Sequence, residues 1–306
     1  MHGAIDLGGT KIEAALLDEN LVPIRRHRIV TPNLDYDDLL AAIGVQINWL
    51  REQSSDGELS IGIGVPGIVN KNTGMTLTSN LPTAGHTFRK DISKIAGYDV
   101  PLENDCRCFA LSEANGGAGE NFNKVFGLIV GTGIGGGICN NGVLTAGLNS
   151  LPVEVAHIPL PATIVKKYNL PLNSCGCGRT GCYETLVSGP GFSKLAKHMV
   201  GVDISVENIV SRANLGDLDM QRVMAVWIEL YAHMLDMIQL MNDPDCIILG
   251  GGTSLIDGLI PKLSEAMQKI ALKNTLGPEL LLAKFGDSSG VRGAAMLPLE
   301  KLMKNR

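Results

Sequence analysis

Residues 6–11 read Asp-Leu-Gly-Gly-Thr-Lys. Their glycine turn, residues 8–11, separates two largely apolar runs, residues 4–7 and 12–17. Short apolar runs on both sides of a glycine turn predict the order strand, turn, strand. The same order returns in the second half of the chain, where residues 125–130 lead into Gly-Thr-Gly-Ile-Gly-Gly-Gly at 131–137. This repeat predicts a duplication, in which two related α/β domains face each other.

The rest of the sequence supplies further elements for both halves. We predict, in chain order, a strand at 21–30, a helix at 36–51, a strand at 60–65, a strand at 100–105, a helix up to 114, a strand at 246–249, a strand at 280–283 and a helix from 291. The Asn-Asn-Gly sequence at 140–142 predicts a tight hairpin. We place a smaller domain at 1–115 and a larger one at 116–290, and expect the C-terminal helix at 291–306 to pack on the smaller domain.

The composition excludes several classes of protein. Of 306 residues, 45% are hydrophobic and 37 are glycine, which excludes a disordered chain, and the glycines lack the period of collagen. The formal net charge of −5 argues against a nucleic-acid-binding surface. Polar residues such as Glu229 and Asp236 interrupt the apolar stretch at 223–241, which predicts a buried helix and no membrane span. Seven cysteines do not make a disulfide scaffold and no secretory signal is visible, so we expect a cytoplasmic protein.

Both glycine loops are candidate phosphate-binding sites. A glycine turn exposes backbone N–H groups and lets a phosphate approach where a Cβ would collide. Asp6 adds a carboxylate suited to hydrated Mg²⁺, Thr10 adds a hydroxyl and Lys11 adds a cation. One such loop can equally be an ordinary hairpin turn, but two indicate that a nucleotide's phosphates are bound from both domains. The sequence contains no Walker pattern, and neither loop leads into a helix as the Rossmann fingerprint requires.

Two further strand ends carry candidate site residues. Three glycines at 250–252 follow the strand at 246–249, and their bare backbone suits a stacked adenine, although a turn before a helix is the alternative. Asp105 ends the strand at 100–105, where a carboxylate can take the proton of a substrate hydroxyl that attacks a γ-phosphate. An Asn-Asp pair before a helix is also a common helix cap, so Asn104 and Asp105 are candidates both for a catalytic site and for a cap.

Three closely spaced cysteines, Cys175, Cys177 and Cys182, follow His157 and are separated by glycines that permit tight turns. Three thiolates and one imidazole make a closed tetrahedral Zn²⁺ site. A disulfide is the alternative, but it leaves one cysteine over and suits a reducing compartment poorly. The other cysteines lie in apolar or structured runs, so we expect inert core thiols at Cys106, Cys108, Cys139 and Cys246.

Together, these motifs resemble the ROK family of bacterial sugar kinases, and most closely the N-acetylglucosamine kinases within it. The resemblance runs from residues 6–11 to the Gly-Asp-Ser-Ser-Gly-Val-Arg-Gly run at 286–293. Its most specific parts are the cysteine motif, which continues into Tyr-Glu at 183–184, and the stretch at 103–114. The Asn-Leu-Pro segment at 80–82 and the Cys-Gly-Cys-Gly form resemble N-acetylglucosamine kinases more than fructokinases.

The resemblance implies an actin-like (RNase H-like) ATPase fold with the sugar in the cleft between two α/β domains. It implies that Asp105 is the base that deprotonates the 6-hydroxyl of the sugar. His157 would ligate zinc with one nitrogen and a sugar hydroxyl with the other, which makes the zinc structural. ATP with Mg²⁺ would bind Asp6, Gly8, Gly9, Thr10, Lys11, Gly131, Thr132, Gly133, Gly135, Gly136, Gly137 and Gly251. The sugar would bind Gly67, Asn80, Asn104, Asp105, Glu154, His157 and Glu184.

The chain departs from the family pattern in two places. The usual Gly-Glu-x-Gly-His reads Val-Glu-Val-Ala-His at 153–157, and we expect the added bulk of Val153 and Ala156 to reshape the loop beside the sugar's C1 and C2 substituents. The usual Asn-Asp-Ala-Asn reads Asn-Asp-Cys-Arg at 104–107. Arg107 either forms a local salt bridge or depresses the pKa of the preceding aspartate. Both departures bear on which sugar is preferred.

We therefore predict an ATP-dependent kinase that converts N-acetyl-D-glucosamine to its 6-phosphate. Glucose, fructose, mannose and N-acetylmannosamine are alternative substrates, and a sugar-binding protein without turnover is a further alternative. A sugar-responsive repressor of the same family would need a helix-turn-helix domain before the first glycine loop, which begins at residue 6, so we do not expect one. The resemblance also implies a homodimer that binds sugar and ATP, with no nucleic-acid or membrane partner.

Overall fold

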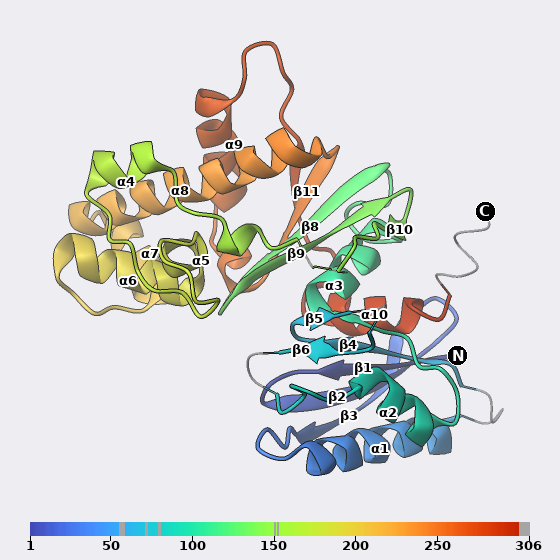
Figure 1. The fold of residues 1–306 in the computed structure, drawn as a ribbon. Coiled ribbons are helices and arrows are strands. Elements are labelled where there is room, and N and C mark those ends of the chain that lie inside the picture. The colour runs from blue at the N-terminus through green and yellow to red at the C-terminus, as the bar shows by residue number, and fades with distance from the viewer. Residues whose placement is uncertain (55–58, 71–72, 79–80, 150, 152, 300–306) are drawn as a thin grey trace. The chain divides into compact units, whose positions relative to one another are not determined.

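The computed structural model describes residues 1–54, 59–70, 73–78, 81–149, 151 and 153–299 (Figure 1). The chain divides into two compact units. The first unit contains Met1–Gly127, Gly136–Val153 and the segment that begins at Ala283, and the second contains Leu128–Gly135 and Glu154–Leu282. The domain boundaries expected at 115 and 290 stay a prediction.

Both halves of the chain begin with three strands and continue with a mixture of helices and strands. The strands are β1 (His2–Leu7), β2 (Lys11–Leu17), β3 (Pro23–Val30), β4 (Ile61–Val65), β5 (Ile68–Val69), β6 (Thr76–Leu77), β7 (Leu102–Asn104), β8 (Lys124–Val130), β9 (Ile134–Asn140), β10 (Val143–Leu144), β11 (Cys246–Gly250) and β12 (Glu279–Leu282). The helices are α1 (Tyr36–Gln53), α2 (Phe88–Ala96), α3 (Asp105–Ala114), α4 (Ala162–Tyr168), α5 (Glu184–Val187), α6 (Gly189–Val200), α7 (Val206–Asn214), α8 (Leu218–Asn242), α9 (Leu259–Ile270) and α10 (Ser289–Met296). Short 3₁₀ turns are η1 (Val155–His157), η2 (Gly252–Leu255) and η3 (Gly286–Ser288).

The two five-stranded sheets have the same strand order. In the first sheet the order is β3-β2-β1-β4-β7, and in the second it is β10-β9-β8-β11-β12. Each sheet therefore consists of three strands consecutive in sequence, followed by two strands that enter later in the chain. The predicted duplication of strand, glycine turn and strand thus extends to the whole topology of both sheets.

In the first sheet, the carboxyl ends of three parallel strands lie at one edge. Strand β1 pairs antiparallel with β2 and parallel with β4, and β4 pairs parallel with β7. Ile5, Ile61 and Ile63 are completely buried in a core that also contains the apolar faces of α1 and α2. Because parallel strands end at the same edge, Asp6 and Asn104 are brought there by backbone pairing alone.

Most predicted elements are confirmed, and two have bounds that differ from the prediction. The hairpin at 140–142 joins β9 to β10, with Asn141 at φ 48° and Gly142 at φ 74°, the left-handed conformations that a two-residue turn requires. Strand β9 begins at Ile134, so the second glycine loop is shorter than the sequence indicates. The helix expected from 291 is α10, which begins at Ser289 and ends at Met296, and residues 300–306 lie outside the described residues.

Helix α10 packs against α3, β1 and β4, and its approach to α3 and β4 is so close that only glycine permits it. A Cβ on Gly293 would overlap the carbonyl group of Cys108 in α3, and a Cβ on Gly62 in β4 would overlap the carbonyl group of Ala294. The backbones are therefore in direct contact on both sides of α10. This contact gives a structural reason for part of the glycine-rich run at 286–293.

The buried carboxylate of Glu113 holds the segment before α10 against the end of α3. It accepts hydrogen bonds from the backbone N–H groups of Ala118 (3.0 Å), Lys284 (3.0 Å) and Phe285 (3.1 Å), and from the hydroxyl of Ser289 (2.6 Å). Next to it, the buried Arg292 guanidinium donates to the carbonyl oxygen of Ser112 at 2.8 Å. A fully hydrogen-bonded buried charge is stable in place, whereas an incompletely bonded one is costly.

Helix α8 is the one helix among the described residues that is long and apolar enough to span a membrane. Most of that stretch is buried inside the structure, and the core helix of a soluble protein passes the same test. Trp227 is completely buried, stacks on Phe192 of α6 with ring centroids 4.4 Å apart, and donates a hydrogen bond to the carbonyl oxygen of Val187. The helix therefore has the protein neighbours of a core element, as its interrupted sequence predicts.

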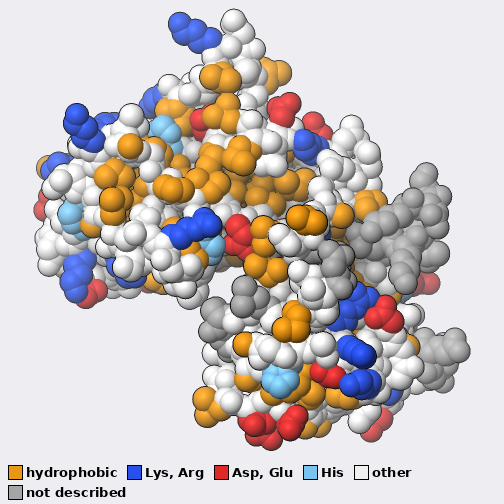
Figure 2. All heavy atoms as spheres, viewed as in Figure 1, with side chains coloured by type: hydrophobic (Ala, Val, Ile, Leu, Met, Phe, Trp, Pro, Cys, Tyr) orange, Lys and Arg blue, Asp and Glu red, His pale blue; other side chains and the backbone are white. Residues whose placement is uncertain are grey.

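Charged side chains of both signs share the surface. On the face drawn in Figure 2, the Lys and Arg side chains of the described residues are spread among Asp and Glu and gather into no extended basic patch. This distribution fits the formal net charge of −5.

We predict that Gly293→Ala lowers the free energy of unfolding by about 3 kcal/mol or more, because the added methyl overlaps a backbone carbonyl that cannot move aside. Gly290→Ala in the same helix is the matched control, because a Cβ there meets nothing within 4 Å. We expect the control to change stability by less than about 1 kcal/mol, in the stabilising direction. Urea unfolding of both variants measures this, and equal stabilities would contradict the close packing.

Candidate functional site

In the first unit, two carboxylates lie at the carboxyl ends of parallel strands. Asp6 is the last residue but one of β1, just before the glycine loop, and Asp105 begins α3 directly after β7. Asn104 caps α3 by accepting a hydrogen bond from the Arg107 N–H at 3.1 Å, and its side-chain amide donates to the carbonyl oxygen of Gly67 at 2.9 Å. Asn104 is therefore the helix cap of the pair, and the Asp105 carboxylate does not have that role.

Both carboxylates bind protons more tightly than an ordinary aspartate. Burial, followed by the charges of Asp105 and Glu13, raises the pKa of Asp6 to about 7. Burial also raises the pKa of Asp105, and a hydrogen bond from the Cys106 N–H at 2.8 Å only partly opposes this. Two partly desolvated carboxylates that repel each other favour a cation or a proton between them.

Arg107 forms a local ion pair, the first of the two alternatives predicted for it. Its Nε lies 3.0 Å from Oε1 of Glu103, both side chains are almost fully buried, and its Nη2 donates to the carbonyl oxygen of Thr145 at 3.0 Å. The second alternative, a depressed pKa for Asp105, is wrong, because burial dominates and the pKa is raised.

The first glycine loop is a closed turn between β1 and β2. The Gly8 N–H donates to the carbonyl oxygen of Lys11 at 2.9 Å, and a Cβ on Gly8 would lie only 3.0 Å from that oxygen. Thr31 holds the turn from the β3 side by donating its hydroxyl to the Gly8 carbonyl oxygen at 2.7 Å. The Thr10 and Lys11 side chains are exposed and free of such packing, so they can contact a phosphate.

The second glycine loop, residues 131–133, is held from several sides within the second unit. The Gly131 N–H donates to the carbonyl oxygen of Gly133 at 2.9 Å, and the Gly131 carbonyl oxygen accepts from the Gly189 N–H at 2.8 Å. Gly251 has a φ of 83°, and a Cβ there would lie 2.5 Å from the carbonyl oxygen of Val130. The Gly251 conformation therefore requires glycine for reasons of packing as well as of backbone strain.

These segments line a hollow of about 550 Å³. The sequence predicted its glycine loop and the residues after β11, but not the two helix starts that complete it. Its walls are the second glycine loop, the residues after β11 and the N-terminal turns of α6 and α7: Gly131, Thr132, Gly189, Pro190, Ser193, Ser205, Val206, Glu207, Gly252 and Thr253. Helix N-termini present free N–H groups and a positive dipole end to an anion. Each of these two helices has a serine N-cap that is visible in the sequence. Ser188, followed by Gly-Pro, indicates the start of α6, and Ser205, followed by Val-Glu, indicates the start of α7.

The structure gives two of the predicted phosphate-loop glycines another role. Gly136 and Gly137 are buried within β9. A Cβ on Gly136 would lie 2.7 Å from the carbonyl oxygen of Gly127, and one on Gly137 would lie 2.8 Å from Cβ of Ala110 in α3. Both glycines thus permit close packing of the strand and helix, and neither is exposed to a ligand. We keep Gly131, Thr132, Gly133 and the half-buried Gly135 as the candidate loop.

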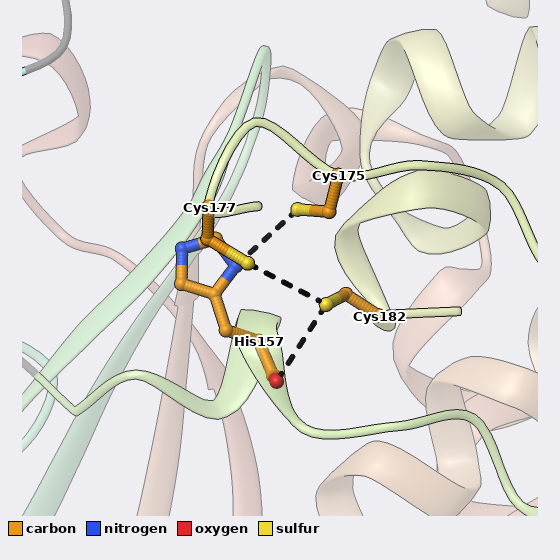
Figure 3. Close-up of side chains that lie close together, drawn as sticks. All are labelled: His157, Cys175, Cys177 and Cys182. Carbon is orange, nitrogen blue, oxygen red and sulfur yellow. Dashed lines mark hydrogen bonds between the residues drawn. The ribbon is translucent and has the colours of Figure 1, made fainter. Parts of the chain in front are cut away.

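The predicted zinc ligands converge in the second unit (Figure 3). The ligand atoms of His157, Cys175, Cys177 and Cys182 all lie within 4.8 Å of one another. The Sγ atoms of Cys177 and Cys182 are 3.7 Å apart, and Nδ1 of His157 lies 3.5 Å from Sγ of Cys175. These separations match the edge of a tetrahedron around Zn²⁺ with bonds of about 2.3 Å to sulfur. They are too long for a disulfide, and all four residues fit a closed metal site.

The two ring nitrogens of His157 face different partners. Nδ1 points toward the cysteines, whereas Nε2 lies 3.6 Å from Oε2 of Glu154. Burial raises the pKa of Glu154. Glu184 also lies beside the cluster, with Oε1 3.7 Å from Sγ of Cys175. The cluster therefore has two carboxylates beside it that are not among the four converging ligands.

The predicted residues thus form two groups, one in each unit. The first unit brings together the loop at 6–11, Gly67, Asn104 and Asp105, and the second brings together the loop at 131–133, Gly251 and the metal cluster with its two carboxylates. Asn80, a predicted sugar ligand, lies outside the described residues. Each group is assembled from segments that are distant in sequence.

Two sheets of identical strand order, each with a glycine loop after its first strand, define the actin-like class of ATPase folds. The model of the ROK family matches residues 2–301, and the chain belongs to the ROK family. It is similar to the N-acetylgalactosamine kinase AgaK of Shewanella sp. (strain ANA-3), with 36% identity over 97% of this chain and 96% of that protein. It is 35% identical to the N-acetyl-D-glucosamine kinase of Yersinia enterocolitica over 98% of this chain and 100% of that protein. The crystal structure of a ROK hexokinase from Thermus thermophilus is similar with a TM-score of 0.86 and 26% identity over 99% of both chains.

We predict that purified protein carries close to one zinc per chain and that Cys177→Ser lowers this content. Cys177 is exposed, so its replacement removes a ligand without disturbing the core. Cys106→Ser, at a half-buried cysteine outside the cluster, serves as the control and keeps the metal. Metal analysis decides the matter, and less than about half an equivalent in the unaltered protein would contradict the site.

A second prediction concerns the dependence of stability on pH. Because the pKa of Asp6 is raised from 3.8 to about 7, the folded protein holds this proton more tightly than the unfolded chain, and stability falls as pH rises through that range. Asp6→Asn removes this loss, so we expect it to raise the free energy of unfolding at about pH 8, relative to about pH 5, by roughly 2–3 kcal/mol. Urea unfolding without nucleotide or Mg²⁺ measures the difference. Asp257→Asn, at an exposed aspartate, should show no such change.

Proposed function

We propose that the protein is an ATP-dependent kinase that phosphorylates the 6-hydroxyl of N-acetyl-D-glucosamine. The observation that carries the proposal is the pair of mutually repelling carboxylates, Asp6 and Asp105, beside a glycine turn at the ends of β1 and β7. One carboxylate can serve the metal–phosphate group and the other the attacking hydroxyl, which are the two requirements of phosphoryl transfer. Relatives of 35–36% identity that are named N-acetylhexosamine kinases support the substrate class.

Asp105 is the proposed general base. As the sugar 6-oxygen attacks the γ-phosphorus, Asp105 accepts the hydroxyl proton, the bond to the bridging oxygen breaks, and ADP leaves. The raised pKa of Asp105 suits this role, because a carboxylate that binds protons more tightly is a stronger base toward the substrate hydroxyl. Asn104 fixes the start of α3 and hence the position of the Asp105 backbone.

The nucleotide would be bound by both glycine loops. Asp6, Gly8, Gly9, Thr10 and Lys11 would face the phosphates from the first unit. Gly131, Thr132, Gly133, Gly135 and Gly251 would hold the nucleotide from the second unit, where the hollow beside α6 and α7 has room for it. Mg²⁺ bound through Asp6 would neutralise charge on the phosphates, and the raised pKa of Asp6 supports a nearby cation as its natural partner.

The sugar would be bound by Gly67, Asn80, Asn104, Asp105, Glu154, His157 and Glu184. Zn²⁺ would be structural, because Nδ1 of His157 faces the cysteines and leaves Nε2 for Glu154 and the sugar. The metal would then orient the imidazole without taking part in the chemistry. Ala156, where the family pattern has glycine, is completely buried.

N-acetyl-D-galactosamine is the second candidate substrate. The relative named for this sugar is as similar to the chain as those named for N-acetyl-D-glucosamine. The two sugars differ only in the orientation of the 4-hydroxyl, so the choice depends on a polar group near that position. Glucose, fructose, mannose and N-acetylmannosamine complete the set to be tested.

We also infer a cytoplasmic protein and a homodimer. The inference of a cytoplasmic location is supported by ATP as the proposed co-substrate and by the seven cysteines, none of which forms a disulfide within the described part of the chain. The inference of a homodimer is supported by resemblance to the family.

A coupled assay of ADP release tests the proposal. It compares seven reactions, one with each of the six sugars named above and one without sugar. We expect turnover on an N-acetylhexosamine, and the absence of turnover on every sugar would exclude the kinase. Asp105→Asn should lower kcat by at least about a hundredfold with sugar affinity nearly unchanged, because the amide cannot accept the proton but can still hydrogen-bond the sugar. Asp257→Asn should behave as the unaltered enzyme, whereas appreciable turnover by Asp105→Asn would remove Asp105 from the base role.

A further inference from the structure

The metal cluster and the second glycine loop are joined by one short segment of the chain. Cys182 is a predicted zinc ligand, and helix α5 (Glu184–Val187) begins two residues later. After α5, Ser188 caps α6, and the Gly189 N–H donates to the carbonyl oxygen of Gly131 at 2.8 Å. All of these residues belong to the second unit. The chain thus runs from a metal ligand to a hydrogen bond with the glycine loop within a few residues.

Glu184 makes a second connection between the same two places. Its Oε2 accepts a hydrogen bond from the Ile134 N–H at 3.1 Å, where the glycine loop enters β9. Its Oε1 lies 3.7 Å from Sγ of Cys175 in the metal cluster. A Cβ on Gly133 would lie 3.2 Å from Oε2, so the carboxylate also packs directly against the loop backbone.

These contacts hold the glycine loop at both ends. The Glu184 carboxylate holds Ile134 after the loop, and Gly189 holds Gly131 at its start. Both come from the segment at 184–189, whose own start is fixed because the Ser188 hydroxyl donates to the Glu184 carbonyl oxygen at 2.7 Å. A loop rich in glycine has much conformational freedom to lose, so such anchors decide how well its N–H groups are directed.

We propose that Glu184 is a positioning residue for the glycine loop at 131–134, through which the metal cluster sets the geometry of the nucleotide-phosphate site. This rests on the proposed function, because it takes the loop to be a phosphate-binding loop. It adds to the sugar contact expected of Glu184 a role toward the other substrate. The hydrogen bond from a backbone N–H to a carboxylate is of the charge-assisted, stronger kind, and it is made before any nucleotide arrives.

The test is the affinity of the protein for a non-hydrolysable ATP analogue with Mg²⁺, measured by calorimetry in the absence of sugar. Without sugar, the loss of a sugar contact cannot affect the result. Glu184→Ala should weaken the binding of the analogue about tenfold, as expected for one lost hydrogen bond to a charged acceptor. An unchanged dissociation constant would overturn the proposal.

Glu184→Gln is the conservative variant. Its amide oxygen can still accept from the Ile134 N–H, so the analogue should bind no more than about twofold more weakly than to the unaltered protein. Zinc content should stay the same in both variants, because Glu184 is not one of the four converging ligands. Binding by Glu184→Gln as weak as that by Glu184→Ala would overturn the proposal, because it would remove the acceptor oxygen as the cause.

Gly189→Ala tests the other anchor and does not depend on the folding of Glu184→Ala. A Cβ on Gly189 would lie 3.2 Å from the Gly131 carbonyl oxygen, so it should displace the loop and weaken analogue binding while sugar affinity is unchanged. Normal analogue binding by this variant would count against the anchors. If the unaltered protein bound sugar but no ATP analogue, the proposed kinase function itself would fail, and that outcome is distinct from all of the above.

Discussion

The buried carboxylate of Glu113 is the interaction on which the first unit depends. It joins the end of α3 to the segment before α10 through three backbone N–H groups and one hydroxyl. Helix α10 then lies in backbone contact with α3 and β4, where Gly293 and Gly62 leave no space for a side chain. Because the other end of α3 carries Asp105, the same constraint that closes the core also fixes the candidate base. A charge this deeply buried is tolerated because its oxygens are hydrogen-bonded.

The candidate active-site carboxylates show the opposite arrangement. Asp6 and Asp105 are placed together by the parallel pairing of β1, β4 and β7, and burial raises the pKa of both, although the charge of Lys11 partly opposes this at Asp6. Arg107, the nearest long cation in sequence, is engaged by Glu103. The site is therefore strained electrostatically in the folded protein, which is the state that a metal–phosphate group and a proton from the substrate would relieve.

In the second unit, the Cys₃His cluster is connected to structure beyond its own four residues. Four ligand atoms converge from η1, the loop at 175–177 and the residue pair before α5. The segment that follows then reaches the glycine loop through Glu184 and Gly189. A structural metal can in this way stabilise a loop that contributes no ligand to it, since the intervening chain is short and hydrogen-bonded at each step.

The sequence by itself determined what depends on near neighbours along the chain. The strand–turn–strand repeats, the Asn-Asn-Gly hairpin, the Asn104 cap and the cysteine spacing could all be predicted, because each has a local conformational or chemical reason. Only the tertiary structure decided the rest. It separated Gly136 and Gly137, which pack against neighbouring backbone and α3, from Gly133, which stays at the loop; it gave Glu113 its partners from the segment after β12; and it brought the starts of α6 and α7 beside Gly131. These outcomes depend on contacts between segments far apart in sequence, for which no local pattern carries a signal.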